Sequence, residues 1–287
     1  KRGVAVKVPE WKSENCIQCN TCAFVCPHAA IRPFILTAGE AAAAPASVKK
    51  AAGKAQLKEY TYALSVSVAD CTGCGNCVDV CPAKEKALEM VSYQEDLQEQ
   101  ENFDWLHSHI GYKENILNKE GNVKNAQFAQ PLFEFSGACA GCGETPYIKT
   151  ITQLWGDHMM IANATGCSSI YGASFPATPY CTNAQGHGPA WANSLFEDFC
   201  EFGLGMKLGS DRARATVAKL MEQGLSCSCC SDEMKALFTQ WLENKNDAKI
   251  TREVADRLVP LMEACGCDTC KALLEYKHFI PSRSQWI

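Results

Sequence analysis

Three segments in the first two thirds of the chain have the hydrophobic pattern of β-strands. Tyr62 to Val68 alternates apolar and small polar residues, which predicts a strand. Phe128 to Phe135 and Met159 to Ala164 are apolar strand-like runs, and an apolar helical segment from Pro146 to Trp155 lies between them. This order of strand, Gly-rich loop, helix and strand predicts the opening of an α/β parallel sheet.

The last third of the chain has the periodicity of helices. Apolar residues recur at helical spacing from Asp211 to Gly224 and from Thr251 to Cys265, which predicts amphipathic helices. Asp232 to Asn244 has the same pattern, and a polar turn at 245–247 joins it to the helix that follows. These two segments therefore predict an antiparallel helical hairpin. Ser284 to Ile287 predicts the first residues of a buried strand.

Two stretches have the composition of surface segments. Ala41 to Ala55 is rich in Ala and Lys and is predicted to be a surface excursion. After Met90 the sequence becomes acidic and amide-rich, which predicts an extended connector over 93–129. A second domain is predicted over 130–287, with a cysteine-rich helical insertion near 211–277.

Length, charge and cysteine content narrow the class of protein. A chain of 287 residues has room for two domains. Its net charge of −5 favours neither nucleic acid nor an anionic membrane as a partner. Nineteen cysteines combined with 47% hydrophobic residues and no charged-then-apolar leader fit a reducing cytoplasm better than a secreted disulfide scaffold. No apolar run approaches the roughly 18 residues of a membrane span. The first residues carry no initiator Met, so we expect the chain to begin inside a longer one.

Eight cysteines lie in a duplicated motif. Asn15 to Pro27 recurs as Asp70 to Pro82, and each copy has the pattern C-x2-C-x2-C-x3-C-P. In this pattern the first three cysteines bind one 4Fe-4S cluster and the fourth binds the other. We therefore assign one cluster to Cys16, Cys19, Cys22 and Cys81, and the second to Cys26, Cys71, Cys74 and Cys77.

Zinc is the alternative for these pairs. Two zinc knuckles would use the C-x2-C spacing but would not explain the third equally spaced cysteine or the Pro after the fourth. The motif therefore predicts an α+β ferredoxin-like domain over 1–92 that transfers electrons singly. His28 follows the first motif and is expected to be a partly exposed structural side chain.

A third cysteine group has a less specific pattern. Cys139 and Cys142 lie in a Gly-rich loop before a predicted helix, and Cys167 follows the next predicted strand. The three thiols are expected to meet at the carboxyl edge of one sheet. Three ligands are not four, so both a metal cluster and unligated core thiols remain open on this pattern alone.

These residues resemble the pyruvate:ferredoxin oxidoreductase family. The resemblance rests on both cluster motifs with their flanks, on Phe135 to Tyr147, on Gly166 to Gly172 and on Gly186 to Asp198. It covers essentially the whole chain and is weakest over 211–277. His187 departs from the family, in which an Arg is expected, so the resemblance implies no anion contact at this position.

The resemblance implies a thiamine-diphosphate enzyme that decarboxylates pyruvate oxidatively, forms acetyl-CoA and passes electrons to ferredoxin or flavodoxin. It implies that Cys139, Cys142 and Cys167 hold a third 4Fe-4S cluster, completed by a cysteine outside this chain, and that Glu144 and Cys167 touch the thiamine diphosphate. The Mg²⁺-diphosphate loop is expected just beyond Ile287. The fold it implies for 130–287 is an incomplete α/β thiamine-diphosphate domain. The chain would then be one segment of a homodimeric enzyme, and no catalytic residue is assigned within it.

Three rival functions remain at this point. They are an oxidoreductase of the same family that acts on another 2-oxoacid, a polyferredoxin-like electron carrier without catalysis, and a zinc-stabilised scaffold.

Six further cysteines are left in the helical insertion. Cys227 and Cys230 form one C-x2-C pair, and Cys267 and Cys270 form another. The predicted hairpin would bring the two groups, with Cys229 and Cys265, to the same end. Tetrahedral zinc, disulfides and free thiols are all compatible with this pattern.

Overall fold

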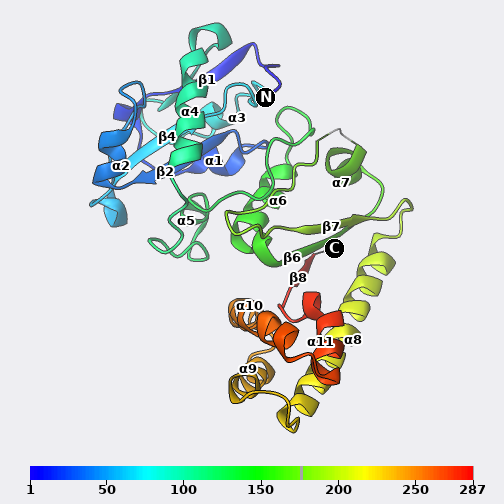
Figure 1. The fold of residues 1–287 in the computed structure, drawn as a ribbon. Helices are drawn as coiled ribbons and strands as arrows, with labels where there is room; N and C mark the ends of the chain where they lie inside the picture. The colour runs from blue at the N-terminus through cyan, green and yellow to red at the C-terminus, as the bar shows by residue number, and fades with distance from the viewer. Residues whose placement is uncertain (175–176, 287) are drawn as a thin grey trace. The chain divides into compact units, whose positions relative to one another are not determined.

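Two small antiparallel sheets form the N-terminal region of the computed structural model, which describes residues 1–174 and 177–286 (Figure 1). The first sheet pairs β1 (Lys7–Trp11) with β5 (Leu88–Ser92), and the second has the order β2 (Ile31–Leu36), β4 (Thr61–Val66), β3 (Ala51–Ala52). The alternating segment that begins near Tyr62 is confirmed as β4. Two short helices, α1 (Thr21–Val25) and α3 (Asn76–Asp79), carry the third cysteine of each motif. Each copy of the repeat is therefore one short helix beside its own strands.

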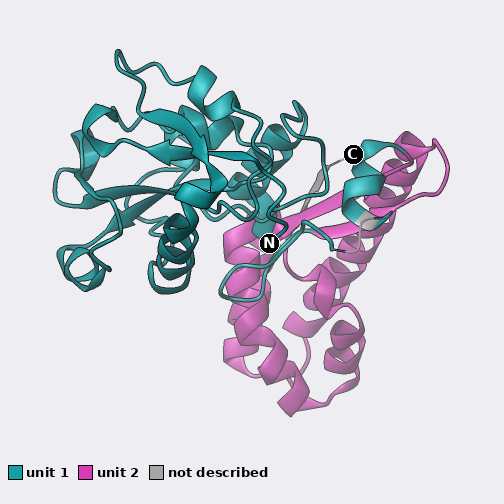
Figure 2. Cartoon of the chain, turned by 90° about the horizontal axis from the view of Figure 1, so that it is seen from above, with its two compact units in different colours: residues 1–157, 166–189 teal, residues 158–165, 190–287 magenta. Residues whose placement is uncertain are grey.

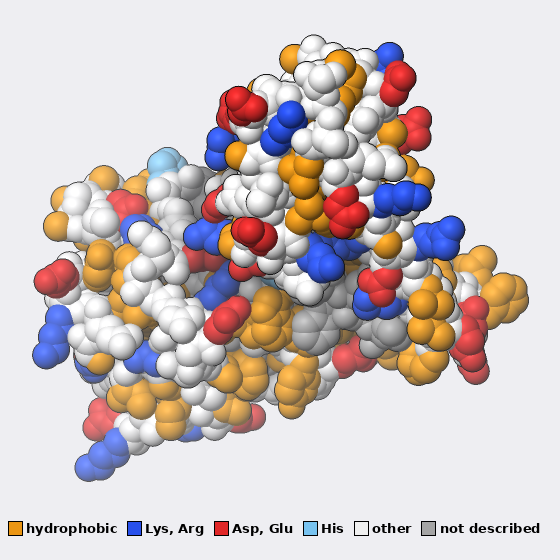
Figure 3. Space-filling view, turned by 90° about the horizontal axis from the view of Figure 1, so that it is seen from below, with side chains coloured by type: hydrophobic (Ala, Val, Ile, Leu, Met, Phe, Trp, Pro, Cys, Tyr) orange, Lys and Arg blue, Asp and Glu red, His pale blue; other side chains and the backbone are white. Residues whose placement is uncertain are grey.

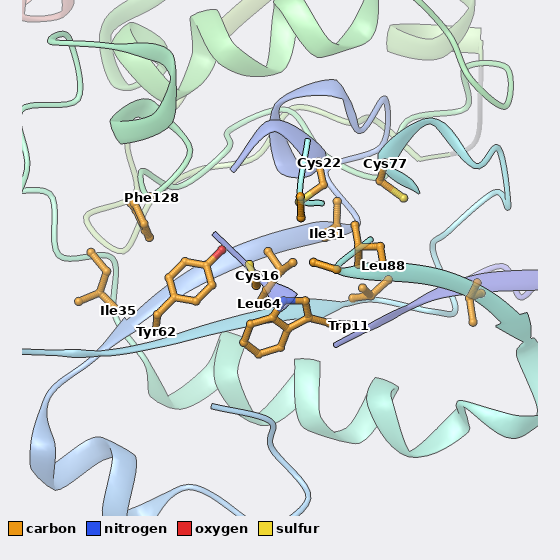
Figure 4. Close-up of a cluster of buried hydrophobic side chains, with 14 of the residues drawn as sticks. Trp11, Cys16, Cys22, Ile31, Ile35, Tyr62, Leu64, Cys77, Leu88 and Phe128 are labelled. Carbon is orange, nitrogen blue, oxygen red and sulfur yellow. The ribbon is translucent and has the colours of Figure 1, made fainter. Parts of the chain in front are cut away.

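The core of this region is continuous with the cysteines. The Trp11 and Tyr62 rings meet edge to face with centroids 5.8 Å apart, and Tyr62 meets Phe128 in the same way at 6.2 Å. These side chains lie in the same buried cluster as Cys16 and Cys22 (Figure 4). Edge-to-face aromatic pairs add specific geometry to the apolar burial. The side chains of Cys16 and Cys22 are thus packed in an apolar core that contains these aromatic rings.

The stretch 93–129, predicted to be extended, instead contains helix α4 (Leu97–His109). Phe103, Leu106 and Ile110 are buried against Phe34 and its neighbours on β2 and β4. Figure 1 shows α4 lying beside these strands. Their spacing of three and four residues is the signal for the helix, but acidic and amide residues surround it. The prediction of an extended connector was therefore wrong for this part. Helix α2 (Ala38–Ala43) extends into the start of the Ala-rich excursion, and α5 (Val123–Ala126) lies near the end of the connector.

Phe128 to Phe135, predicted to be a strand, forms none. Only Phe133 makes an isolated bridge, with Tyr180. Phe128 instead packs on Tyr62, and Phe133 meets the rings of Tyr171 and Tyr180. The apolar residues of this run are buried by side chains on several sides, so their hydrophobicity reflects packing rather than a sheet.

A buried ion pair holds this run to the N-terminal region. The Arg32 side chain on β2 is 4% exposed and pairs with Glu134, while its Nη1 donates to the Tyr112 hydroxyl at 3.0 Å. The guanidinium also lies over the rings of Phe103 and Phe135. Burial opposes the charge, but Tyr112 and Glu134 more than compensate and raise the pKa of Arg32 above its usual value. The buried Arg32 guanidinium therefore connects β2 with Tyr112 of the connector and with Glu134 of the loop that follows.

The chain packs as two compact units (Figure 2). The first contains Lys1–Asp157 and Gly166–Pro189, and the second contains His158–Thr165 and Ala190–Ile287. This division differs from the predicted domain boundary at residue 130, because the stretch up to Asp157 packs with the first unit. The first unit therefore also holds α6 (Thr145–Trp155), which matches the predicted helix, and the short α7 (Cys167–Ser169).

The second unit combines a parallel sheet with four helices. Its strands have the order β7 (Ala190–Asn193), β6 (Met159–Asn163), β8 (Ser284–Trp286), and both outer strands run parallel to β6. The predicted strands at Met159 and Ser284 are confirmed, whereas β7 was missed. Four helices follow β7, namely α8 (Phe199–Leu225), α9 (Asp232–Glu243), α10 (Ala248–Cys265) and α11 (Asp268–Glu275). The three amphipathic helices predicted from periodicity are present, and α8 begins well before Asp211.

In the described part of the chain no helix is long and apolar enough to cross a membrane. On the face drawn in Figure 3, Lys and Arg side chains are interspersed with Asp and Glu side chains. That face therefore offers mixed rather than single-sign charge to a partner.

Candidate functional site

Two pockets in the first unit are each lined by four cysteines. Cys16, Cys19 and Cys22 share one pocket with Cys81, and Cys71, Cys74 and Cys77 share the other with Cys26. Each pocket thus takes three sulfurs from one motif and the fourth from the other. This is the crossed grouping that the spacing predicts.

The two motifs adopt the same backbone turns. Gln18 and Gly73, at matching positions, have φ of 60° and 70°, and Asn20 and Gly75 have φ of 61° and 80°. In these turns the amide of Gln18 donates to the Cys16 sulfur at 3.4 Å, and the amide of Gly73 donates to the Cys71 sulfur at 3.3 Å. At Gly73 a Cβ would also lie 2.9 Å from the Lys7 carbonyl oxygen. Glycine, which has no Cβ, therefore suits this left-handed and crowded position.

The donor set fits a cluster rather than a single ion. Among the described residues, none of these eight sulfurs belongs to a group of three potential ligands within 4.8 Å of one another. A single zinc ion needs sulfurs about 3.8 Å apart, given Zn–S bonds of about 2.3 Å. Burial raises the pKa of Cys71 to about 12 and that of Cys22 well above its usual value. Thiolates at these positions therefore need the compensating charge that iron supplies.

A buried lysine lies beside both pockets, and sequence reasoning missed it. Lys149 on α6 is 2% exposed, and its Nζ donates to the carbonyl oxygens of Ala23 and Phe24 at the end of α1. Burial lowers the pKa of Lys149 to about 8, while the sulfurs of Cys26 and Cys22 act in the opposite direction. Helical periodicity places this residue on the buried face of α6, which is the only sequence signal for it. At neutral pH it is a buried positive charge next to two cluster ligands.

The third cysteine group is less assembled. Cys139 and Cys167 are exposed and Cys142 is partly buried, and the three sulfurs do not gather within 4.8 Å in the described part of the chain. Cys139 and Cys142 follow no strand, so the premise that placed them at a sheet edge was wrong. Their loop nevertheless lies against the pocket that contains Cys74, because a Cβ on Gly141 would be 3.6 Å from Cβ of Cys74. Glu144 is the N-cap residue of α6, and its Oε1 accepts a hydrogen bond from the Tyr171 hydroxyl at 2.9 Å.

His28 is not partly exposed as predicted. It is 2% exposed and lines the pocket of Cys26, Cys71, Cys74 and Cys77. Burial lowers the pKa of its imidazole, and the positive charge of Arg2 acts in the same direction. His28 therefore forms a neutral wall of this pocket. Its main-chain oxygen accepts from the amide of Phe135 at 2.9 Å, which places it between this pocket and the Cys139 loop.

The comparison with known families agrees with the two pockets. The 4Fe-4S dicluster domain matches residues 12–84, a range that contains all eight cysteines of the two motifs. Two 4Fe-4S clusters are therefore the cofactors of this part of the chain.

Curated relatives extend the match to the whole chain. The chain is 52% identical to pyruvate-flavodoxin oxidoreductase of Klebsiella pneumoniae. The match covers all of this chain and 24% of the relative. The chain is 48% identical to pyruvate:ferredoxin oxidoreductase of Moorella thermoacetica, again over all of this chain and 25% of the relative. It is also 40% identical to the mitochondrial pyruvate dehydrogenase [NADP(+)] of Euglena gracilis, of which it covers 16%. The chain thus spans a quarter or less of the length of these relatives. Over its whole length the chain is similar to one segment of the pyruvate-flavodoxin and pyruvate:ferredoxin oxidoreductases.

Proposed function

We propose that this chain is the electron-transferring segment of an enzyme that oxidises pyruvate with coenzyme A to acetyl-CoA and carbon dioxide. The observation that carries the proposal is the pair of crossed four-cysteine pockets with the Cys139 loop packed against one of them. Pyruvate is the substrate we favour because the relatives named above share it in their names and differ in the electron acceptor. Ferredoxin or flavodoxin is the acceptor we propose.

The residues of this chain hold and tune the redox centres. When bound, 4Fe-4S clusters accept and release single electrons. The crossed cysteines fix two clusters within one small domain, and the amides of Gln18 and Gly73 donate to ligand sulfurs. Lys149 adds a positive charge beside both pockets. Amide donors and a nearby cation both stabilise the reduced, more negative state of a cluster.

We further propose that Cys139, Cys142 and Cys167 hold a third 4Fe-4S cluster with a cysteine from another region of the enzyme. The contact between Gly141 and Cys74 supports this role, because it sets the loop beside the next redox centre. Glu144 and Cys167 would contact thiamine diphosphate, whose Mg²⁺ is bound by residues outside this chain. Tyr171 donates a hydrogen bond to Glu144, and burial raises the pKa of Tyr171, so its hydroxyl keeps the proton with which it orients the carboxylate. The remaining regions of the enzyme, a homodimeric assembly and a cytoplasmic location are expectations that go with this proposal.

The proposal is tested with the full-length protein that contains this sequence. Anaerobic mixing with thiamine diphosphate, Mg²⁺, coenzyme A and pyruvate should bleach the cluster absorption and produce acetyl-CoA. Reduction by 2-oxobutyrate or 2-oxoglutarate with kcat/KM values above that for pyruvate would favour another 2-oxoacid as substrate. Clusters that accept electrons from dithionite but from no 2-oxoacid would favour a carrier without catalysis.

Lys149→Met should make the reduction potentials of both clusters more negative. Loss of one buried positive charge near each cluster corresponds to a shift on the order of 50 mV, taking an effective dielectric near 20. Potentiometric titration followed by electron paramagnetic resonance measures it. In the unmodified protein the potentials should also fall as the pH rises through and above about 8, because the ammonium then loses its proton. This pH dependence should be absent from the Met variant.

Lys58→Met is the matched control, since Lys58 is exposed and its charge is screened by water. Equal potentials in the Lys149→Met variant and the unmodified protein would contradict an electrostatic role for this side chain.

A further inference from the structure

Four cysteines of the second unit meet at one point. The sulfurs of Cys230, Cys265, Cys267 and Cys270 all lie within 4.8 Å of one another. They come from three places in the sequence, namely the turn between α8 and α9, the last residue of α10, and the start of α11. Among the described residues this is the single group of potential metal ligands gathered so closely. We propose that these four thiolates bind one structural zinc ion.

The ligand set differs from the one that cysteine spacing suggests. The two C-x2-C pairs would combine Cys227 and Cys230 with Cys267 and Cys270. In the structure Cys265 takes the place of Cys227. The cause is Gly266, which ends α10 with φ of +64° and reverses the chain so that Cys265 and Cys267 face the same site. The ligand pattern is therefore C-x-C-x2-C together with one distant cysteine.

The geometry suits a single ion. Four sulfurs around tetrahedral zinc lie about 3.8 Å apart, given Zn–S bonds of about 2.3 Å. Separations within 4.8 Å need only a small contraction to reach this value. Within the described residues the two ferredoxin-type pockets have no such close group, so two size classes of cysteine site are present. An all-sulfur donor set excludes Mg²⁺ and Ca²⁺, which prefer oxygen, and matches structural zinc sites built from four cysteines.

Four mutually close thiols also differ from what disulfides require. A disulfide joins two sulfurs and separates them from the remaining pair, whereas here each sulfur is close to the other three, and all four are free. The Cys265 thiol donates to the main-chain oxygen of Cys229 at 3.3 Å, which ties the α10 end to the turn before α9. The arrangement is therefore that of four sulfurs around one ion rather than that of two disulfide bonds.

The site closes one end of a helical core. Cys270 is fully buried and Cys230 is 5% exposed, in the same cluster as Met221, Phe238 and Met262. Helices α8 and α9 approach closely there, since a Cβ on Gly224 would lie 2.6 Å from the Phe238 ring. An ion at this point would fasten the start of α9, the end of α10 and the start of α11. We infer that the zinc ion is structural and holds α9, α10 and α11 together at the short turns that join them.

The experiment measures zinc and iron together in the full-length protein that contains this chain, purified without added chelator. We expect about one zinc per chain in addition to the iron of the clusters. Cys270→Ser and Cys267→Ser should each reduce zinc to a small fraction of this value while iron is retained. Cys229→Ser, at an exposed position outside the group, and Cys227→Ser should keep the zinc.

X-ray absorption at the zinc edge tests the site without any substitution. Four sulfur neighbours at about 2.3 Å are expected. Oxygen or nitrogen ligation, absence of zinc, or zinc that persists in the Cys270→Ser variant would overturn the proposal. Mass spectrometry that finds Cys230, Cys265, Cys267 or Cys270 in disulfides in the anaerobically purified protein would overturn it as well. Because the iron content is followed in the same samples, failure of this proposal is distinguishable from failure of the redox function.

Discussion

Cys19→Ala should damage one cluster and Cys26→Ala the other, although the two residues belong to the same motif. Cys19 lines the pocket completed by Cys81, whereas Cys26 lines the pocket of Cys71, Cys74 and Cys77. Each substitution removes one of four iron ligands, so each should lower the iron of the first hundred residues from about eight atoms toward about four. Iron analysis together with electron paramagnetic resonance of the reduced protein separates the two outcomes.

Cys200→Ser is the control for these two variants, because Cys200 is exposed and lines neither pocket. It should leave iron and both resonances unchanged. If Cys19→Ala and Cys26→Ala changed the same resonance, the crossed assignment would be wrong.

Arg32→Met should lower the free energy of unfolding of the first unit by about 3 kcal/mol. The substitution leaves the Glu134 carboxylate, which is 20% exposed, without its buried cationic partner, and breaking such a pair typically costs about 3–5 kcal/mol. We place the value at the low end because Glu134 keeps some contact with water. Urea denaturation followed by tryptophan fluorescence under anaerobic conditions measures the change.

Lys207→Met is the matched control for this stability measurement. It removes an exposed ion pair with Asp211 on α8 and should change stability little. Arg32→Met should also loosen the Cys139 loop, because Glu134 and Phe135 lead directly into it. A variant as stable as the unmodified protein would show that the guanidinium does not hold this junction together.

The sequence predicts which cysteines share a pocket because the motif is local. Eight cysteines at fixed spacing, with left-handed turns at Gln18, Asn20, Gly73 and Gly75, leave little freedom in how three sulfurs face one centre. The pairing of Cys26 with the second motif follows from the same spacing. The buried face of α4 was harder to predict, since Phe103, Leu106 and Ile110 are embedded among polar residues.

Other features depend on contacts that spacing does not encode. The apolar run from Phe128 to Phe135 looks like a strand, but its side chains are buried by Tyr62, Tyr171 and Tyr180 rather than by neighbouring strands. Cys265, and not Cys227, joins the close group of Cys230, Cys267 and Cys270, where Gly266 reverses the chain after α10. Lys149 has no motif at all, and its importance comes from what α6 packs against.

The crossed grouping of the cysteines has a consequence for how the domain tolerates change. Each bound cluster would act as a cross-link between the two motifs, so the chain from Cys26 to Cys71 would be a loop closed at both ends by iron and sulfur. The entropy of closing such a loop grows slowly, by about 0.6 kcal/mol for each doubling of its length. Most of Ala41 to Ala55 is exposed or partly exposed, although Val48 is buried in the core beside α4. Sequence inserted at the exposed Ala42 and Ala43 would therefore lengthen a pinned loop without moving either redox centre, which makes this excursion the natural place for the domain to acquire new parts.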